Sequence, residues 1–178
     1  LKKKKSDTAI YLGCGPSINE LNPTTVSSIL DFDIWTVNNF IFHNFIVPDF
    51  YHPEIKEHRD GPIMRKIFKN KFKEYKNVNW VIDGTRQYLS DMLKLYNNVY
   101  KYNKDMSNKL SQNGNYKPSG DRLQVRCYAS LSLLLETLVR MEYKKIYFLG
   151  CDLYSSEYFW TNNNEYAHLN LNSEAPLM

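Results

Sequence analysis

The chain has 178 residues, of which 43% are hydrophobic and 15% aromatic, a composition that suits one ordered domain with its own core and excludes intrinsic disorder. No apolar run approaches the roughly 18 residues that a membrane helix requires. The net charge of +4 is modest and does not favour nucleic-acid binding, and the lysine cluster Lys2–Lys5 is either a solvated tail or a contact to an anionic membrane surface.

The chain begins with a short apolar run followed by two glycines. Thr8–Leu12 has the length and composition of a buried strand, and the next five residues are Gly13, Cys14, Gly15, Pro16 and Ser17. The glycines permit a sharp turn and a close approach of the backbone to a ligand, while Pro16 and a Ser17–Glu20 capping box predict a helix start. This order is typical of the turn that receives a nucleotide phosphate in Rossmann-like domains, although the third glycine of the dinucleotide fingerprint is missing. The stretch is therefore either a phosphate turn or a plain structural turn.

A second strand is predicted at Asp33–Val37, after a short helix that begins at Asn22-Pro23 and ends near residue 30. Asn38 and Asn39 follow this strand at its carboxyl end, where open α/β sheets bind their ligands. Amide side chains suit a ribose or a base edge, so the two residues either contact a nucleotide or close a turn. The stretch Asp31-Phe32-Asp33 has the spelling of a metal-binding DxD motif. It precedes its strand, however, and we interpret it as two turn carboxylates.

Two histidines lie near the predicted third strand at Pro48–Pro53. His43 stands in an aromatic stretch, which indicates a packed histidine rather than a ligand. His52 lies at the carboxyl end of the strand, where a ligand contact is expected. A metal cluster around it would have to use the neighbouring side chains Glu54, Glu57 and His58. Their spacing matches no zinc pattern and no cysteine joins them, so we expect no metal here.

The middle of the chain alternates between helical and strand patterns. We expect an amphipathic helix at Pro62–Tyr75, a strand at Val78–Ile82, a helix at Thr85–Tyr96 and a strand at Val99–Tyr102. Residues 104–120 are polar and lack periodicity, which predicts a long surface loop of the kind that often serves as a lid.

The last third of the chain holds its longest predicted helix. Gln124–Met141 is apolar nearly all round, which predicts burial against the sheet, and Lys145–Leu149 is then predicted to be a central strand. Gly150, Cys151 and Asp152 follow at its carboxyl end, and we expect residues 153–178 to form a lid-like segment. The whole order predicts an α/β, Rossmann-like fold with a mostly parallel sheet, flanking helices and right-handed crossovers, in one nucleotide-binding domain over residues 1–178.

The three cysteines stand at positions 14, 127 and 151. They lie far apart without CxxC spacing, which argues against a disulfide framework and predicts a reducing, cytoplasmic compartment. The chain starts at Leu1 and ends at Pro176-Leu177-Met178, so we expect it to be a fragment of a longer protein. Whether it forms a homo-oligomer is left open.

Three blocks of the sequence resemble one known family. Ile10–Leu21, Asp31–Phe40 and Tyr143–Tyr154, in that order, resemble the bacterial sialyltransferases of glycosyltransferase family 42, while the region between Lys56 and Leu123 is unmatched. The resemblance implies a single nucleotide-binding α/β domain with a lid, CMP-sialic acid as donor, a glycan such as lipooligosaccharide as acceptor, no metal and no other cofactor. It also implies work at the inner face of the bacterial membrane. The Gly-x-Gly-Pro-Ser turn occurs in a wider set of Rossmann-like proteins, including flagellin-glycosylation factors and a pterin pyrophosphokinase.

For donor binding, the resemblance implies a phosphate turn made by Gly13, Gly15, Pro16 and Ser17. It implies nucleotide contacts from Asn38 and Ser130, and Asn39 and Asp152 join them by their positions after predicted strands. Two residues depart from the family pattern, because Cys14 and His52 stand where it has asparagines. A relative that uses another nucleotide sugar fits these departures as well.

For catalysis, the resemblance implies that Tyr154 and Tyr158 hydrogen-bond the departing phosphate and that His168 is the general base. An inverting glycosyltransferase is therefore our first hypothesis. The alternatives are a magnesium-dependent pyrophosphokinase of the hydroxymethylpterin type, using Asp83 and Asp152, and a non-catalytic nucleotide-sugar-binding module of a larger enzyme. Aromatic packing of the tyrosines, and an ordinary loop position for His168, also remain open.

Overall fold

The computed structural model describes residues 4–54, 57–105, 122–124, 130–155 and 157–169. The loop predicted at 104–120 falls almost wholly outside these ranges. Residues 170–178 of the predicted lid-like segment, and Cys127, also lie outside them.

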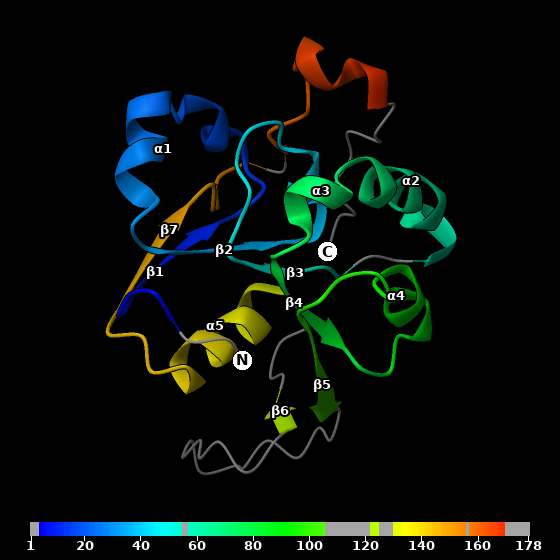
Figure 1. Ribbon diagram of the computed structural model, residues 1–178. Coiled ribbons are helices and arrows are strands. Elements are labelled where there is room, and N and C mark those ends of the chain that lie inside the picture. Colours follow the sequence, from blue (N-terminus) through cyan, green and yellow to red (C-terminus); the bar gives the residue numbers. More distant parts are fainter. Residues whose placement is uncertain (1–3, 55–56, 106–121, 125–129, 156, 170–178) are drawn as a thin grey trace.

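The centre of the molecule is a parallel sheet of seven strands in the order β6-β5-β4-β3-β2-β1-β7 (Figure 1). Every described pairing between neighbouring strands is parallel. The predicted α/β, Rossmann-like fold is thereby confirmed. In chain order the strands are β1 (Thr8–Leu12), β2 (Asp33–Val37), β3 (Phe50–His52), β4 (Asn79–Asp83), β5 (Val99–Asp105), β6 (Arg122–Gln124) and β7 (Lys145–Leu149).

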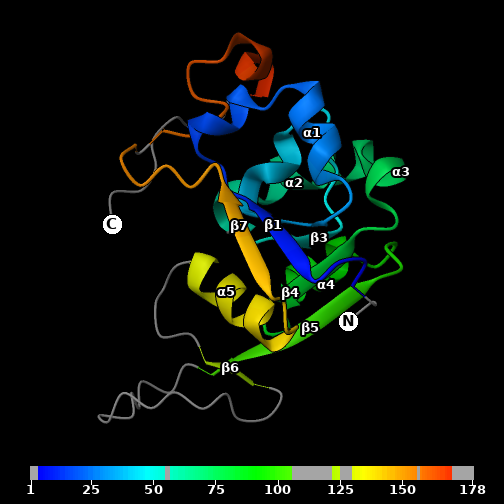
Figure 2. The ribbon, with the colours of Figure 1, turned by 90° about the vertical axis from the view of Figure 1, so that its left-hand side faces the viewer.

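Helices cover both faces of the sheet (Figure 2). One face carries α1 (Pro23–Ile29), α2 (Glu57–Asn70), α3 (Phe72–Tyr75) and α4 (Gln87–Met92), and the opposite face carries α5 (Ser130–Arg140). Three 3-10 helices complete the described elements: η1 (Pro16–Glu20), η2 (Asn38–Phe42) and η3 (Asn164–Leu169). The predicted start of α1 is confirmed, because the Asn22 side chain accepts a hydrogen bond from the Thr25 amide at 2.9 Å and Pro23 follows at the first helical position.

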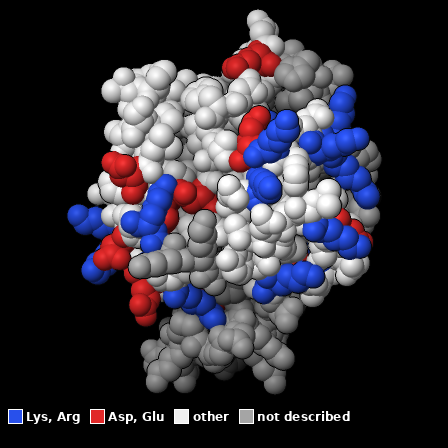
Figure 3. All heavy atoms as spheres, in the orientation of Figure 1, with Lys and Arg blue, Asp and Glu red and all other residues white. Residues whose placement is uncertain are grey.

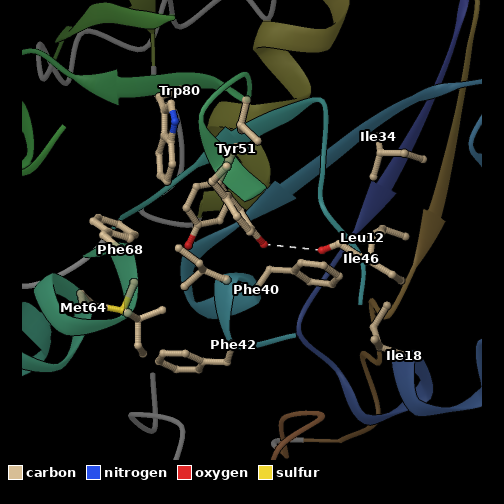
Figure 4. Packing of buried hydrophobic residues seen from close by; sticks show 14 of the residues in the cluster. Leu12, Ile18, Ile34, Phe40, Phe42, Ile46, Tyr51, Met64, Phe68 and Trp80 are labelled. Carbon is tan, nitrogen blue, oxygen red and sulfur yellow. Dashed lines mark hydrogen bonds between the residues drawn. The ribbon is translucent and has the colours of Figure 1, made fainter. Parts of the chain in front are cut away.

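The core has two halves because successive side chains of a strand point to opposite faces. Ile10 and Leu12 of β1 belong to the larger half, beneath α1 to α4, and Ala9 and Tyr11 belong to the half beneath α5. The larger half is strongly aromatic (Figure 4). There the Trp80 ring is fully buried, with its centroid 5.0 Å from that of Tyr51 and 5.2 Å from that of Phe68. Truncation of such a residue to alanine costs about 3–5 kcal/mol.

The strand order reverses at β1, since β2 to β6 extend to one side and β7 lies on the other. In open α/β sheets the ligand crevice lies outside the carboxyl ends of the strands at such a reversal. The turns that follow β1 and β7 therefore meet at the edge where a ligand is expected. The carboxyl ends of β2 and β3 lie next to them along the same edge.

Three predictions about individual elements are wrong. Lys145–Leu149 is the edge strand rather than a central one, and Tyr147 and Phe148 are 52% and 41% exposed. The helix predicted from Gln124 begins at Ser130, and β6 occupies residues 122–124 instead. The helix predicted after the glycine turn is the five-residue 3-10 helix η1, without a side-chain cap. These features depend on contacts between residues that are distant in the sequence, and a local sequence pattern carries no information about such contacts.

Acidic and basic side chains are interspersed on one face of the molecule, with basic ones more frequent over the flank that carries α2 and α3 (Figure 3). Two lysines of the predicted N-terminal tail are held against the domain: the Lys4 Nζ lies 3.4 Å from Asp7, and the Lys5 Nζ lies 2.7 Å from Asp49. Among the described residues, no helix has the length and apolar character needed to cross a membrane.

Candidate functional site

The two glycines after β1 lie against the turn that follows β7. The Gly13 amide donates to the Leu149 carbonyl and the Gly15 amide to the Gly150 carbonyl, both at 2.8 Å. A Cβ added at Gly13 would lie 2.3 Å from the Gly150 oxygen, and one added at Gly15 would lie 2.2 Å from Oδ2 of Asp152. Glycine is thus required at both positions by the protein's own packing. The close approach of the two turns is by itself a sufficient reason for both glycines.

A carboxylate of the protein already binds the amide that the sequence assigned to a phosphate. The Ser17 N–H donates to Oδ2 of Asp152 at 2.9 Å, and the Tyr154 hydroxyl donates to Oδ1 at 3.3 Å. Partial burial opposes ionisation of Asp152, but the hydrogen bonds from Ser17 and Tyr154 prevail and hold its pKa below the ordinary value. The predicted Ser17–Glu20 capping box is wrong, since the cap comes from a residue 135 positions away. Phosphate binding at this turn stays a prediction.

The segment after β7 is attached to the turn after β1. The Phe159 amide donates to the Cys14 carbonyl at 2.8 Å, and the Asn19 side chain donates to the Phe159 carbonyl at 2.7 Å. Phe159 is fully buried in the larger core half. The predicted lid is therefore attached to the domain at Phe159, next to the glycine turn, whereas Leu153 and Tyr154 at its start are exposed.

The three predicted catalytic residues have different surroundings. Tyr154 is 85% exposed, whereas Tyr158 is half-buried and stacks on Trp160 with ring centroids 4.4 Å apart. The backbone of His168 belongs to η3, but its side chain lies outside the part of the structure that is described. The roles of all three residues stay predictions.

A ring of hydrogen bonds joins the carboxyl ends of β2 and β3 to the start of α5. The Asn38 Nδ2 donates to the Ser130 Oγ at 3.1 Å, the Ser130 hydroxyl donates to Oε2 of Glu54 at 2.5 Å, and the Glu54 amide donates to the Asn38 Oδ1 at 3.2 Å. Each of the three residues is partly exposed. The structure thus brings together Asn38 and Ser130, two predicted nucleotide contacts that are 92 positions apart. We call these three residues the Asn38 ring.

The backbone of Asn38 is held in an uncommon conformation. Its φ of 50° lies in the left-handed region, which costs a residue other than glycine about 1 kcal/mol or more. The buried Tyr51 hydroxyl donates to the Asn38 carbonyl. The neighbouring Asn39 is partly exposed and starts η2 together with Asn38. Such local strain is typical of residues that the surrounding fold positions for binding.

His52, the last residue of β3, is buried, with 2% of its surface exposed. Its Nδ1 lies 2.7 Å from the Val81 carbonyl, which only accepts, so Nδ1 carries the proton and Nε2 accepts from the Tyr102 hydroxyl at 3.3 Å. Burial raises the pKa of Tyr102 above its usual range. The pair joins the end of β3 to β4 and β5, and a direct contact between His52 and a nucleotide stays a prediction.

Asp83 ends β4 at the same edge, and its carboxylate is used within the protein. Thr85 donates to Oδ1 through its amide at 3.0 Å and its hydroxyl at 2.7 Å, and the Arg86 Nε lies 3.6 Å from Oδ2. Burial of the Arg86 guanidinium opposes its charge, but the hydrogen bond to Tyr88 and then the charges of Glu54 and Asp83 outweigh burial and raise the pKa of Arg86. This cluster carries mixed charge, and no group of three potential metal ligands occurs among the described residues.

His43 is buried, and Cys14 and Cys151 are partly buried; the predicted nucleotide contact of Cys14 stays a prediction. His43 is buried and stacked on Phe40, and burial followed by the charge of Lys71 lowers its pKa to about 4; the prediction of a packed histidine is confirmed. Burial raises the pKa of Cys14 to about 12 and that of Cys151 to about 11, which disfavours the thiolate form of both residues at neutral pH. The Cys14 Sγ is 3.6 Å from the Val37 carbonyl.

The DxD stretch lies at the amino end of β2, whereas the Asn38 ring lies at its carboxyl end. Asp33 is the first residue of β2 and is buried, and its Oδ2 accepts from the Tyr143 hydroxyl at 2.9 Å. Its Oδ1 accepts from the Lys5 amide at 3.2 Å, whereas Asp31 is exposed. The structure thus gives Asp33 a role in packing at the amino end of the strand.

Sequence reasoning missed Glu54 and Tyr102 as parts of the candidate site. Glu54 had been weighed only as a metal ligand, and Tyr102 only as a strand residue. The rule that drew attention to Asn38, position at the carboxyl end of a strand, applies equally to Glu54 after β3. Tyr102 gives no such signal, because its contact with His52 spans 50 positions.

The carboxyl ends of the strands thus offer the amide of Asn38, the hydroxyl of Ser130 and the carboxylate of Glu54. This set of hydrogen-bonding groups suits a polar, hydroxyl-rich ligand. Comparisons of the chain with protein-family models, with curated proteins and with solved structures found no match.

Proposed function

We propose that the chain is the nucleotide-sugar-binding domain of an inverting glycosyltransferase, similar to the family 42 sialyltransferases, that passes a sugar from a nucleotide-activated donor to a glycan acceptor. The observation that carries the proposal is the 3.1 Å contact between Asn38 and Ser130. The resemblance implies a nucleotide contact for each of these two residues, which are 92 positions apart in the sequence. Their meeting at the carboxyl edge of a Rossmann-like sheet supports a nucleotide site there.

In the proposed reaction the acceptor hydroxyl attacks the anomeric carbon as the bond to the donor phosphate breaks. The proton of that hydroxyl passes to His168, since a neutral imidazole is the side chain best suited to take up a proton near pH 7. The bonding electrons pass to the leaving phosphate, whose charge increases. Tyr154 and Tyr158 are the hydroxyl donors for that charge, and Tyr154, being 85% exposed, can turn from Asp152 towards a phosphate.

The geometry disfavours the pyrophosphokinase alternative. Asp83 ends β4 and Asp152 follows β7, with β3, β2 and β1 between those strands. At about 4.8 Å per strand, β4 and β7 themselves stand roughly 19 Å apart. The Asp152 carboxylate reaches only to the turn after β1, at the Ser17 amide, so the arrangement disfavours one magnesium ion bound at about 2 Å from both carboxylates. Both carboxylates also accept hydrogen bonds within the protein.

Binding and catalysis are tested separately. A thermal-shift screen of nucleotides and nucleotide sugars should show a selective stabilisation, because a ligand that binds only the folded state raises stability by RT ln(1 + [L]/Kd). His168→Ala should leave that stabilisation unchanged and lower kcat by about 10²–10⁴. Binding without any transfer to glycan acceptors would favour the non-catalytic module. A screen in which no nucleotide stabilises the chain would refute the proposal.

A further inference from the structure

We propose that the solvent face of α2 and α3 docks the domain onto an anionic membrane surface, with the side chains of Phe45 and Val47 entering the headgroup layer beside it. The docking surface combines lysines of two consecutive helices with exposed apolar residues of a neighbouring loop. The inference goes beyond the proposed function and does not depend on nucleotide binding.

The positive charge of the chain is concentrated in one short stretch. Residues 65–76 contain six lysine or arginine residues and one glutamate, a formal charge of +5, whereas the whole chain carries +4 and the other residues together therefore −1. Basic side chains are accordingly more frequent over the flank that carries α2 and α3 (Figure 3). An anionic surface is therefore attracted mainly to these helices. Four lysines elsewhere form ion pairs with aspartates: Lys4, Lys5, Lys94 and Lys144.

The helical spacing places four exposed lysines on one side of this stretch. The Lys71 amide donates to the Ile67 carbonyl at 2.8 Å and the Tyr75 amide donates to the Lys71 carbonyl at 3.0 Å, so the spacing continues from α2 into α3. Intervals of three and four residues return to the same face of a helix. The exposed residues with these intervals, which we call the lysine face, are Lys66, Lys69, Lys73 and Lys76. The side turned to the core consists of Met64, Ile67, Phe68 and Tyr75.

Two exposed apolar side chains lie on the loop at residues 43–47, next to the start of α3. Phe45 is 57% exposed and Val47 is 38% exposed. Lys71 and Tyr75 donate hydrogen bonds to carbonyl groups of this loop at 2.6 Å and 3.5 Å, respectively. The loop is thereby fixed to the helices that carry the lysine face. Apolar side chains beside a basic helical surface are typical of proteins that lie in a membrane interface.

The chemistry of the surface favours a lipid bilayer over other anionic partners. A lysine ammonium group is a hydrated point charge without the planar fork that recognises a single phosphate, so four of them suit a diffuse layer of charge. An aliphatic side chain such as Val47 is stabilised by entering the headgroup layer, whereas single-stranded nucleic acids are bound through aromatic stacking. The tail lysines Lys4 and Lys5, considered for a membrane contact from the sequence, are held in ion pairs within the protein.

The first test measures sedimentation of the full chain with vesicles of phosphatidylcholine alone and of an equal mixture with phosphatidylglycerol. Wild type should bind the mixture only, and more weakly as salt rises from about 0.1 M to about 1 M and the Debye length falls from about 10 Å to about 3 Å. Lys69→Gln combined with Lys73→Gln should weaken binding about 30-fold, at about 1 kcal/mol per lysine. Lys101→Gln combined with Lys145→Gln removes the same charge from exposed positions of β5 and β7 and should bind as wild type.

The second test uses Phe45→Trp to report whether the loop enters the lipid. The native Trp35, Trp80 and Trp160 are buried, with 0%, 0% and 6% of their surface exposed, so the new indole is the exposed one. On anionic vesicles its emission should shift to shorter wavelength and be quenched by phosphatidylcholine that carries bromine in its acyl chains. Unchanged emission from the bound protein, equal loss of binding in the two double variants, or failure of wild type to bind would refute the proposal.

Duplex DNA of mixed sequence is measured in the same buffer as the competing anionic partner. It should bind more weakly than the anionic vesicles. If DNA binds through the lysine face and the vesicles do not bind, the surface is a nucleic-acid interface and the membrane assignment is wrong. Every substituted side chain is exposed in the folded protein, so thermal unfolding of each variant should match wild type and attribute a loss of binding to the surface itself.

Discussion

Gly15→Ala should destabilise the protein itself, whatever it does to ligand binding. The new Cβ would lie 2.2 Å from Oδ2 of Asp152 and 2.8 Å from the Gly150 oxygen, whereas ordinary contact begins near 3.4 Å, so the carboxylate must retreat by the difference, about 1.2 Å. Retreat of the carboxylate breaks its 2.9 Å bond from the Ser17 amide, and relief of the separate contact with the Gly150 oxygen breaks the 2.8 Å bond from the Gly15 amide. One charge-assisted and one neutral hydrogen bond together contribute about 2–4 kcal/mol.

For a chain of this size that loss corresponds to a fall in Tm of about 5–15 °C. The measurement is urea and thermal unfolding of Gly15→Ala, of Asp152→Ala and of the double variant. Asp152→Ala removes the carboxylate that the new methyl group contacts first. The double variant should therefore lose about 1 kcal/mol or more less stability than the sum of the losses in the two single variants. Strict additivity, or an unchanged Tm in Gly15→Ala, would refute the packing argument. The experiment also matters for function, since weaker nucleotide binding by a Gly15 variant would not by itself identify a phosphate turn.

Three further predictions concern charge. The pKa of His43 in the folded chain is lowered to about 4, whereas an unfolded histidine binds a proton near pH 6.5. Lowering the pH from 7 to 5 therefore stabilises the unfolded state. Over this range the free energy of unfolding, measured with urea, should fall by about 2 kcal/mol more in wild type than in His43→Gln. Asp152→Asn should strengthen binding of a nucleoside monophosphate if the phosphate competes for the Ser17 amide, and an unchanged Kd by calorimetry would locate the phosphate elsewhere. Transferase turnover in excess EDTA should match turnover with added manganese, and strict metal dependence would return Asp31 and Asp33 to consideration.

Local patterns were sufficient where an element is decided by its own residues. The cap at Asn22 and the proline after it start α1 as predicted, and the alternation of Asp33–Val37 produces β2. Asn38 was recognised as a candidate because the end of a parallel strand can be read from sequence. The packed state of His43 followed from its aromatic neighbours.

Contacts between distant residues were not predictable in the same way. A strand of Ile, Tyr, Phe and Leu looks the same at the centre of a sheet as at its edge, so β7 was misjudged. The cap on Ser17 comes from Asp152 across 135 positions, while the local rule pointed to Glu20. The carboxylate of the Asn38 ring was overlooked because its partner Ser130 lies 76 positions further along the chain.

The hydrogen bonds within the protein favour the Asn38 ring, rather than the glycine turn, as the centre of the candidate site. At β1 and β7 the glycines are required by the neighbouring turn, and the exposed amide of the short helix already has an anionic partner in Asp152. A ligand there must displace a protein carboxylate, which opposes binding. At β2, β3 and α5 the polar groups satisfy one another in a single ordered ring and still have hydrogen-bonding capacity at Asn38 and Ser130. A ligand there gains hydrogen bonds without breaking any, so recognition of the nucleoside at the Asn38 ring should contribute more to donor affinity than the glycine turn that first suggested a nucleotide.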